Sequence, residues 1–383
     1  MKTLEEELAQ RRAQHLYRER LVLESPQGTE VRVGDETLLS FCSNDYLGLA
    51  NHPRVLAAFH AGAESYGVGA GASHLVSGHS RAHHALEEEL ADFAGAERAL
   101  LFSAGYMANL GVVSALCDRH DVIFEDRLNH ASLIDAARLT RAKVSRYPHV
   151  DTARLADMLV SAHAPGLITT DAVFSMDGDI APLAELCRLA SRHDVWLLAD
   201  DAHGFGVLGR SGRGSFEHLD VPLAPPAILM GTLGKALGVF GAFVAGEAAL
   251  IETLIQRSRT YIYTTALPPA VAEAVRASLK LVREEGWRRE HLQTLVTQFR
   301  TGAQKLGFTL TSSPTPIQPL ILGDAAAALT ASRRLRENGI LIPAIRPPTV
   351  PEGSARLRIT FSAAHEAVHV DRLLEVLSGL KSA

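Results

Sequence analysis

The segment Val195–Gly204 joins an apolar run to a dense group of ionisable residues, Asp200, Asp201 and His203. An apolar run that ends in acids is typical of a buried strand at the point where it leaves the sheet. In open α/β sheets, ligands bind outside the carboxyl ends of the strands. A carboxylate and an imidazole at this point can bind a ligand and move a proton, although a strand end capped by solvated acids gives the same pattern.

A second unusual segment is Ile228–Gly238, in which Lys235 lies between glycines just after an apolar run. A buried ammonium group is costly unless it is paired or hydrogen-bonded. Glycines let the backbone approach a flat ligand closely, and the lysine amine can react with a carbonyl group. The alternative is a surface lysine in a glycine-rich loop.

Taken together, the two segments meet the requirements of pyridoxal 5'-phosphate (PLP). This cofactor needs an amine that binds its aldehyde and a carboxylate that keeps its ring nitrogen protonated, so that the ring accepts electrons. The sequence therefore predicts a PLP enzyme with Lys235 as the lysine that binds the cofactor and Asp200 as the partner of the pyridine nitrogen.

Short β-branched runs alternate with helical stretches through the middle of the chain, for example the helix predicted over Leu183–His193. Such alternation indicates βαβ units and a mostly parallel, doubly wound sheet, so the predicted fold class is α/β. The predicted strands are Ala99–Phe102, Asp121–Phe124, Lys143–Tyr147, Gly166–Thr170, Val195–Ala199, Ala227–Gly231 and Gly241–Ala245.

The flanking regions predict further units. Residues 1–50 are expected to form an amphipathic helix over 2–22 and a hairpin over Val31–Phe41, ahead of a large PLP-binding α/β domain over 51–285. Residues 268–305 are expected to be helical with a break near Gly286. A smaller α+β domain is expected over 286–383, with strands at 307–311, 317–322, 340–345 and 355–361 and helices at 324–338 and 365–380.

The composition argues against nucleic-acid-binding, zinc-binding, secreted and membrane-spanning proteins. The 383 residues carry a formal net charge of −5 and no basic block, which argues against nucleic acid as a partner. Cys42, Cys117 and Cys187 are far apart, which suits a reducing compartment and shows no zinc-binding spacing, so no metal is expected. The N-terminal region alternates acidic and basic residues and lacks a secretory signal, and no apolar run reaches the roughly 18 residues of a membrane span, so we expect a cytoplasmic protein.

Several ordered motifs then make a resemblance specific. The chain resembles the α-oxoamine synthase family of fold-type I PLP-dependent transferases, which join an amino acid to an acyl thioester with loss of CO2. The resemblance covers nearly the whole chain. It rests on Ser43–Gly48, Val173–Gly178, Asp200–Gly204, Gly231–Lys235 and Ala355–Arg358.

The resemblance implies roles for residues around the cofactor. His130 corresponds to the histidine that stacks on the PLP ring and contacts substrate, and His203 to a partner of the cofactor's phenolic oxygen, helped by Ser175. Gly105 and Tyr106 open a predicted helix whose positive end can bind phosphate, and Thr232 is expected to add a hydroxyl. The implied catalytic residues are Lys235, His130, Asp200 and His203.

The resemblance also implies a homodimer and a substrate site. Thr264 and Thr265 correspond to a segment that reaches the phosphate from the other subunit, although a polar turn before Pro268 is the alternative. Arg358 corresponds to the clamp on the amino-acid carboxylate, because a guanidinium binds a carboxylate through two hydrogen bonds. Arg356 is its nearest rival. The residues that correspond to positions near the acyl substrate are Arg18, Asn44, Arg346 and Thr349.

Within the family, the segment Ala344–Pro351 most resembles the members that condense L-alanine with a pimeloyl thioester, carried by coenzyme A or acyl carrier protein, in biotin biosynthesis. Sister enzymes that make 5-aminolevulinate or 2-amino-3-ketobutyrate are alternatives, as is a non-catalytic subunit of a synthase complex. An aminotransferase or a nicotinamide dehydrogenase fits less well, since Gly67–Gly71 lacks a preceding strand. Ala72 and His74 depart from the family pattern, in which glycine and arginine are common.

Overall fold

The computed structural model describes residues 3–162, 164 and 166–381. The chain divides into two compact units, each built from separate stretches of sequence. The large unit comprises Leu49–Ser175 and Ile180–Arg289. The small unit comprises the residues up to Gly48, Met176–Asp179 and those from Glu290 onward.

A seven-stranded sheet forms the centre of the large unit, in the order β3-β9-β8-β7-β6-β4-β5. The neighbours from β5 to β8 pair in parallel, and β9 runs antiparallel to both β8 and β3. All seven predicted strands are confirmed to within two residues. Their bounds are β3 Arg98–Phe102, β4 Val122–Asp126, β5 Lys143–Tyr147, β6 Gly166–Asp171, β7 Trp196–Asp200, β8 Ala227–Thr232 and β9 Ala242–Gly246.

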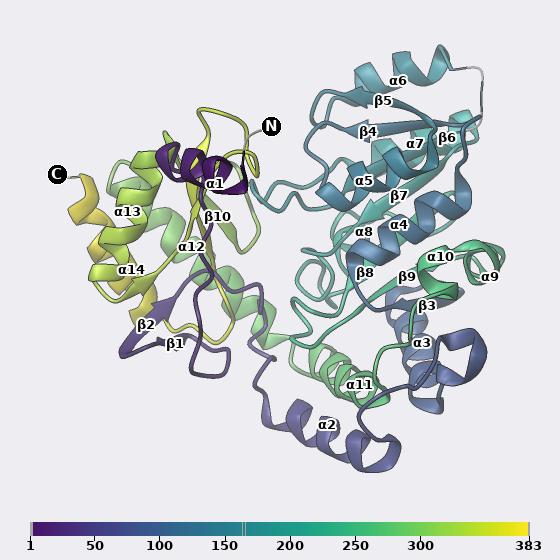
Figure 1. Cartoon of the computed structure of the whole chain (residues 1–383), viewed down its shortest axis with the longest axis horizontal. Coiled ribbons are helices and arrows are strands. Elements are labelled where there is room, and N and C mark those ends of the chain that lie inside the picture. The colour runs from purple at the N-terminus through teal and green to yellow at the C-terminus, as the bar shows by residue number, and fades with distance from the viewer. Residues whose placement is uncertain (1–2, 163, 165, 382–383) are drawn as a thin grey trace. The chain divides into compact units, whose positions relative to one another are not determined.

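Helices accompany these strands, as Figure 1 shows. Val112 of α4, Leu133 of α5 and Leu254 of α9 share one buried core with Leu198 and Val244 of the sheet. Because helices cover both faces of the central strands, their sequences are continuous apolar runs and do not alternate between apolar and polar residues. The helical elements of this unit are α2 Pro53–Tyr66, η1 His74–Gly78, α3 Arg81–Ala94, α4 Gly105–Leu116, α5 Ala131–Thr140, α6 Thr152–Val160, α7 Leu183–His193, α8 Ser215–His218, α9 Ala248–Arg257, α10 Arg259–Ile262 and α11 Pro269–Glu284.

The small unit holds two three-stranded sheets, β1-β2-β11 and β10-β13-β12. In the first, Leu39 of β2 pairs in parallel with Ile340 of β11, so strands from the two ends of the chain are neighbours. The second sheet is antiparallel. The elements are α1 Leu4–Ala13, β1 Glu30–Val33, β2 Glu36–Ser40, α12 Trp287–Lys305, β10 Ile317–Gly323, α13 Ala325–Glu337, β11 Ile340–Leu341, β12 Ala344–Ile345, β13 Ala355–Thr360 and α14 Ala367–Lys381.

The structure corrects three predicted elements, and residue 2 of the first lies outside the described residues. The helix expected over 2–22 is only α1, because His15 takes a left-handed conformation (φ 58°) and α1 buries none of its described side chains. The strand expected at 307–311 is absent, and the carbonyl of Thr311 accepts instead from Arg300. The strand expected at 340–345 is two short strands in different sheets. Among the described residues, none of the helices is both long and apolar enough to cross a membrane.

Candidate active site

The large unit contains a pocket of about 210 Å³ where several parallel strands end. Polar side chains line it because β6, β7 and β8 end there in Asp171, Asp200 and Thr232. The lining residues are Gly105, Tyr106, His130, Ser132, Asp171, Ser175, Asp200, Ala202, His203, Met230, Thr232 and Lys235. The structure thus brings together eight of the ten residues predicted to bind cofactor.

Lys235 lies in the loop between β8 and β9, and its side chain points to the end of β7. Its Nζ lies 2.9 Å from Nε2 of His203, which is buried. An amine held at hydrogen-bonding distance from an imidazole can exchange a proton with it, since either nitrogen can hold the proton. The pair is therefore arranged for proton transfer inside the pocket.

Asp200 ends β7 and is buried, with both carboxylate oxygens hydrogen-bonded. Oδ2 accepts from Nδ2 of Asn109 at 2.7 Å, and Oδ1 accepts from the backbone N–H of Ala202 at 3.0 Å. Asp171 lies beside it, because these two residues are paired in the parallel register of β6 and β7. Burial raises the pKa of Asp171 well above its usual value and the negative charge of Asp200 adds to this, while Lys235 opposes it. Asp171 therefore favours its neutral form beside Asp200.

The next residue, Asp201, is not among the described residues that line the pocket. It accepts hydrogen bonds from the backbone N–H of Ser215 at 2.7 Å and from its hydroxyl at 2.6 Å. Burial raises the pKa of Asp201 to about 7, and the bonds from Ser215 limit the rise. Of the two adjacent acids, Asp200 lies at the site and Asp201 supports the loop that follows β7.

His130 is the N-cap of α5, and its backbone N–H donates to Asp171 at 3.1 Å. Its Nδ1 lies 2.8 Å from the hydroxyl of Ser132, which also accepts from Asn109. Desolvation lowers the pKa of His130, Asp200 opposes this and Lys235 reinforces it. The imidazole is therefore held in the pocket in a fixed orientation and mainly neutral.

The opposite end of the pocket is suited to an anion. Helix α4 begins at Gly105, so the N–H groups of its first turn, including that of Tyr106, have no partner within the helix. Such a helix end carries partial positive charge and binds phosphate readily. The hydroxyl of Thr232 donates to the carbonyl of Gly241 at 3.1 Å, and Thr232 and Ser175 complete the lining.

This donor set fits PLP. One cavity is lined by an amine, a buried carboxylate and a helix N-terminus, which match the aldehyde, the ring nitrogen and the phosphate of the cofactor. The residues that would hold PLP are Lys235, Asp200 and the start of α4.

Apart from His130, which lines the pocket of the large unit, the predicted substrate residues form two groups in the small unit. In the first, which we call the Arg358 group, Arg358 donates to Oδ1 of Asn44 at 3.1 Å and to the hydroxyl of Tyr46 at 3.4 Å. Arg356 has other partners. It forms an ion pair with Asp177 at 2.6 Å and donates hydrogen bonds to two backbone carbonyls. Arg358 thus contacts Asn44 and Tyr46, whereas Arg356 is paired with Asp177.

The second group, which we call the Arg346 group, joins the two ends of the sequence. Arg18 donates to the hydroxyl of Thr349 at 3.2 Å, and Arg346 donates to the carbonyls of Tyr17 (3.2 Å) and His15. Desolvation lowers the pKa of Arg346, and the nearby Arg18 adds to this. Arg18, Arg346 and Thr349 thus lie near one another, while Asn44, also expected near the acyl substrate, contacts Arg358, and the role of all four in substrate binding stays a prediction.

Thr264 and Thr265 are not among the described residues that line the pocket. Thr265 instead pairs with Ser73 in an isolated β-bridge, and its carbonyl accepts from the hydroxyl of Ser103 at 3.4 Å. Their expected role in a partner's site stays a prediction.

Sequence reasoning missed Asn109, Ser132 and Asp171, which connect Asp200 to His130. The position of Asp171 in the sequence could have identified it. It directly follows the predicted strand Gly166–Thr170, as Asp200 follows the predicted strand Val195–Ala199. Asn109 lies one turn into α4 and Ser132 two residues after His130. Neither position is distinctive until the helices are packed together.

Comparisons with known proteins agree with this geometry. The sequence matches the family described as aminotransferase class I and II over residues 36–377. The 8-amino-7-oxononanoate synthase of Nitrosococcus oceani is 62% identical over 97% of this chain and 99% of its own length. The chain belongs to the 8-amino-7-oxononanoate synthase family.

Solved structures of such enzymes share the fold. The 8-amino-7-oxononanoate synthase from Francisella tularensis matches with a TM-score of 0.79 and 34% identity, covering 90% of this chain and 98% of that one. A structure of SPT (serine palmitoyltransferase) with PLP matches with a TM-score of 0.91 and 29% identity, covering 95% and 92%. The fold-type I architecture and the PLP pocket described above agree with membership of the 8-amino-7-oxononanoate synthase family.

Proposed function

We propose that this chain is a PLP-dependent acyltransferase that condenses L-alanine with a pimeloyl thioester in biotin biosynthesis. Alanine, the thioester and one proton give 8-amino-7-oxononanoate, CO2 and the free thiol, so atoms and charge balance. The observation that carries the proposal is the 62% identity to an 8-amino-7-oxononanoate synthase over 97% of the chain, together with a pocket that contains Lys235, Asp200, His203 and His130.

PLP, when bound, supplies an electron sink that stabilises negative charge at the amino-acid Cα. The protein's task is to hold protons and charges in place. Asp200 is held in place by two hydrogen bonds and lies beside Asp171, whose raised pKa favours its neutral form, so that Asp200 can bind a protonated ring nitrogen. Lys235 can take a proton at Cα and return it, and His203 at 2.9 Å fixes its amine.

The substrate residues are assigned by the same proposal. Arg358 is to bind the alanine carboxylate, since it is a buried guanidinium next to Asn44 and Tyr46 and a guanidinium can bind a carboxylate through two hydrogen bonds. Arg18, Asn44, Arg346 and Thr349 are to contact the acyl substrate.

A product assay tests the function directly. Purified protein with PLP is given alanine, glycine or serine together with acyl thioesters of several lengths, carried on coenzyme A or on acyl carrier protein, and products are identified by mass spectrometry. We expect alanine with the pimeloyl thioester to give the highest kcat/KM and one CO2 per product. Preference for glycine with a short acyl group would assign the chain to a sister activity instead.

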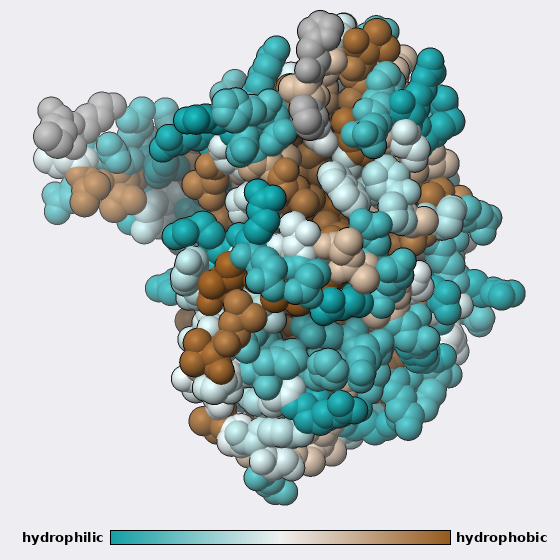
Figure 2. Space-filling model, turned by 90° about the vertical axis from the view of Figure 1, so that its right-hand side faces the viewer, coloured by the Kyte–Doolittle hydropathy of each residue, from teal (hydrophilic) through white to brown (hydrophobic). Residues whose placement is uncertain are grey.

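We also propose that the protein is a homodimer in which Thr264 and Thr265 complete the partner's phosphate site. Their segment pairs with the glycine-rich loop at Ser73, and large apolar side chains nearby in sequence are exposed, with Tyr263 70%, Val76 79% and Val68 88% accessible. Figure 2 shows hydrophobic patches within a mostly hydrophilic face of the molecule. An apolar surface of this kind favours association.

Subunit mixing tests the dimer. A Lys235→Ala chain is combined with a Thr264→Ala/Thr265→Ala chain, so that a mixed dimer has one doubly damaged site and one intact site if the contacts cross the interface. Activity above that of both parents is expected. Activity at the parents' level would place both threonines and the lysine in sites built by single chains.

The cellular location proposed is the cytoplasm, because Cys42, Cys117 and Cys187 are all free thiols.

A further inference from the structure

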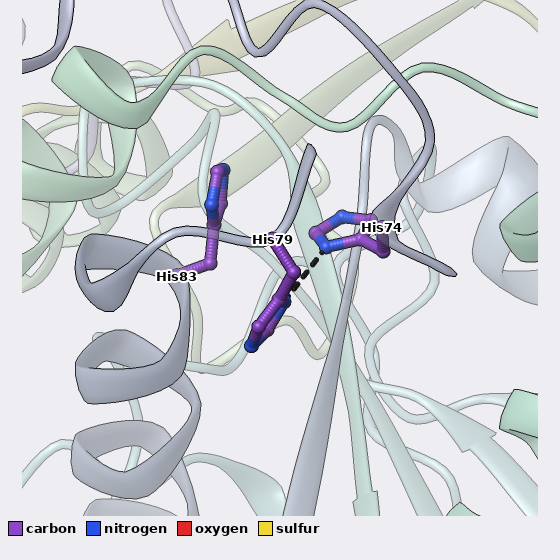
Figure 3. Close-up of side chains that lie close together, drawn as sticks. All are labelled: His74, His79 and His83. Atoms are coloured by element: carbon purple, nitrogen blue, oxygen red, sulfur yellow. Dashed lines mark hydrogen bonds between the residues drawn. The ribbon is translucent and has the colours of Figure 1, made fainter. Parts of the chain in front are cut away.

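Histidines gather where η1 leads into α3, in the large unit but among residues that do not line the PLP pocket. His74 and His79 are joined through their Nδ1 atoms at 3.0 Å, the contact drawn as a dashed line in Figure 3. His83 and His84 follow on the first turn of α3. Two sets of three side chains here have donor atoms within 4.8 Å of one another: His74, His79 and His83, and His79, His84 and Glu87.

The first set is a poor metal site because both ring nitrogens of His83 are already used. Its Nδ1 accepts from the backbone N–H of Ser80 at 3.0 Å, and its Nε2 lies 2.7 Å from the carbonyl of Leu267. His83 is completely buried, so a metal ion would have to replace one of these bonds in the core. His83 therefore has a structural role, as the cap of α3 and its link to Leu267.

The second set is already spaced for a metal ion. Nε2 of His79 lies 3.5 Å from Nδ1 of His84 and 3.9 Å from Oε2 of Glu87. Ligand atoms of a tetrahedral zinc site, with bonds of about 2.0–2.2 Å, lie about 3.3–3.6 Å apart. The two histidines meet this spacing, and a change of side-chain rotamer can bring the Glu87 carboxylate, which lies within 4.8 Å of both, to the same distance.

Each of these three side chains is also oriented through its other donor atom. Nδ1 of His79 contacts His74, which is buried and stacked on Tyr261. Nε2 of His84 lies 3.5 Å from Glu88, and Oε1 of Glu87 accepts from the N–H of Leu101 at 2.9 Å. Metal ligands in proteins are characteristically held by outer partners of this kind, which fix the tautomer and the ring orientation.

The geometry points to a binding site for a divalent transition-metal ion of the zinc class, formed by His79, His84 and Glu87. Two imidazoles and one carboxylate are borderline ligands that suit Zn²⁺, and calcium or magnesium would require more oxygen ligands. Because the side chain of His84 is 55% exposed, water can occupy the remaining position. The bound ion would tie the start of α3 to β3 through Glu87 and Leu101. The proposal is independent of the proposed catalytic function.

Calorimetric titration of the PLP-loaded, chelator-treated protein with ZnCl2 tests the site. We expect one ion per chain with a dissociation constant in the micromolar range or below. His84→Gln and Glu87→Gln should each weaken binding by more than about 100-fold, because loss of an outer partner alone costs about 10- to 100-fold. Glu88→Gln should show that smaller, outer-partner effect. His60→Gln, a change of an exposed histidine on α2, is the matched control and should leave binding unchanged.

Folding is checked by the melting temperature without metal, which should be the same in all four variants and the wild type. His84 is exposed and Gln at position 87 keeps an oxygen for the N–H of Leu101, so both changes are compatible with the fold. The proposal is overturned if wild-type protein binds zinc no more tightly than the His84→Gln and Glu87→Gln proteins, or binds it only at millimolar concentrations.

Discussion

The PLP pocket of the large unit and the two arginine groups of the small unit are assembled in different ways. The pocket collects residues at or just beyond the ends of neighbouring strands, such as Asp200 and Lys235, so the order of the strands decides which side chains meet. The Arg358 and Arg346 groups join positions more than 300 residues apart, such as Arg18 with Thr349. The pocket is thus a product of local sequence and topology, and the arginine groups depend on how the chain ends are brought together.

The largest effect expected from the pocket comes from Lys235→Ala. Removal of the amine should reduce turnover to the background rate, because neither covalent binding of PLP nor proton transfer at Cα is then possible. Some PLP should still bind through the phosphate end of the pocket. In wild-type protein, borohydride should fix PLP on Lys235, as located by peptide mass spectrometry. The same label on another lysine would contradict the assignment.

The next effect compares two adjacent acids. Asp200→Asn should lower kcat by about 100-fold or more, since an amide removes a fixed charge that the reaction requires. Asp201→Asn is the matched control and should retain near wild-type turnover, because an amide can accept from the N–H of Ser215 and donate to its hydroxyl. If the two variants were affected in the opposite order, Asp201 would be the cofactor's partner.

A smaller effect is expected in the small unit. Arg358→Lys keeps the charge but loses the planar fork, so alanine binding should weaken by about 10- to 150-fold, the equivalent of losing one charged hydrogen bond of about 1.5–3 kcal/mol. Spectroscopic titration of the PLP-loaded protein with alanine measures this without the acyl substrate. Arg356→Lys should instead lower the melting temperature, because it disturbs a buried ion pair with Asp177. Unchanged alanine affinity in Arg358→Lys would move the role to another residue.

The last expected effect is on the pH dependence of stability and leaves turnover nearly unchanged. Folding raises the pKa of Asp201 from its ordinary value of 3.8 to about 7. The folded protein therefore binds a proton that the unfolded chain releases, and the stabilisation is complete below about pH 4 and lost as the pH rises to 7, by about 1.4 kcal/mol per pH unit. Asp201→Asn removes this dependence. The difference in melting temperature, variant minus wild type, should increase from pH 5 to pH 8, and a constant difference would contradict it.

Most strands of the large unit could be predicted from the sequence, because buried parallel strands consist of continuous apolar runs. Asp200, Lys235 and His203 were predictable because they lie at the ends of such runs or between glycines. The link through Asn109 and Ser132 was not, since it depends on the packing of α4 against α5. The residues of the arginine groups were found only through resemblance, because no local pattern connects Arg18 with Thr349. The prediction of a helix over 2–22 was wrong in its length, because hydrophobic spacing alone does not show whether the helix has a surface to pack against.

The parallel pairing of Leu39 with Ile340 has a consequence for biosynthesis. During translation β2 leaves the ribosome roughly three hundred residues before β11, so all strands of the large unit emerge in the interval. That unit can therefore fold cotranslationally, whereas the N-terminal hairpin waits with one strand edge unpaired. Exposed strand edges are templates for aggregation. A chain that ends before residue 340 would thus have a folded large unit and an unpaired, aggregation-prone edge at β2.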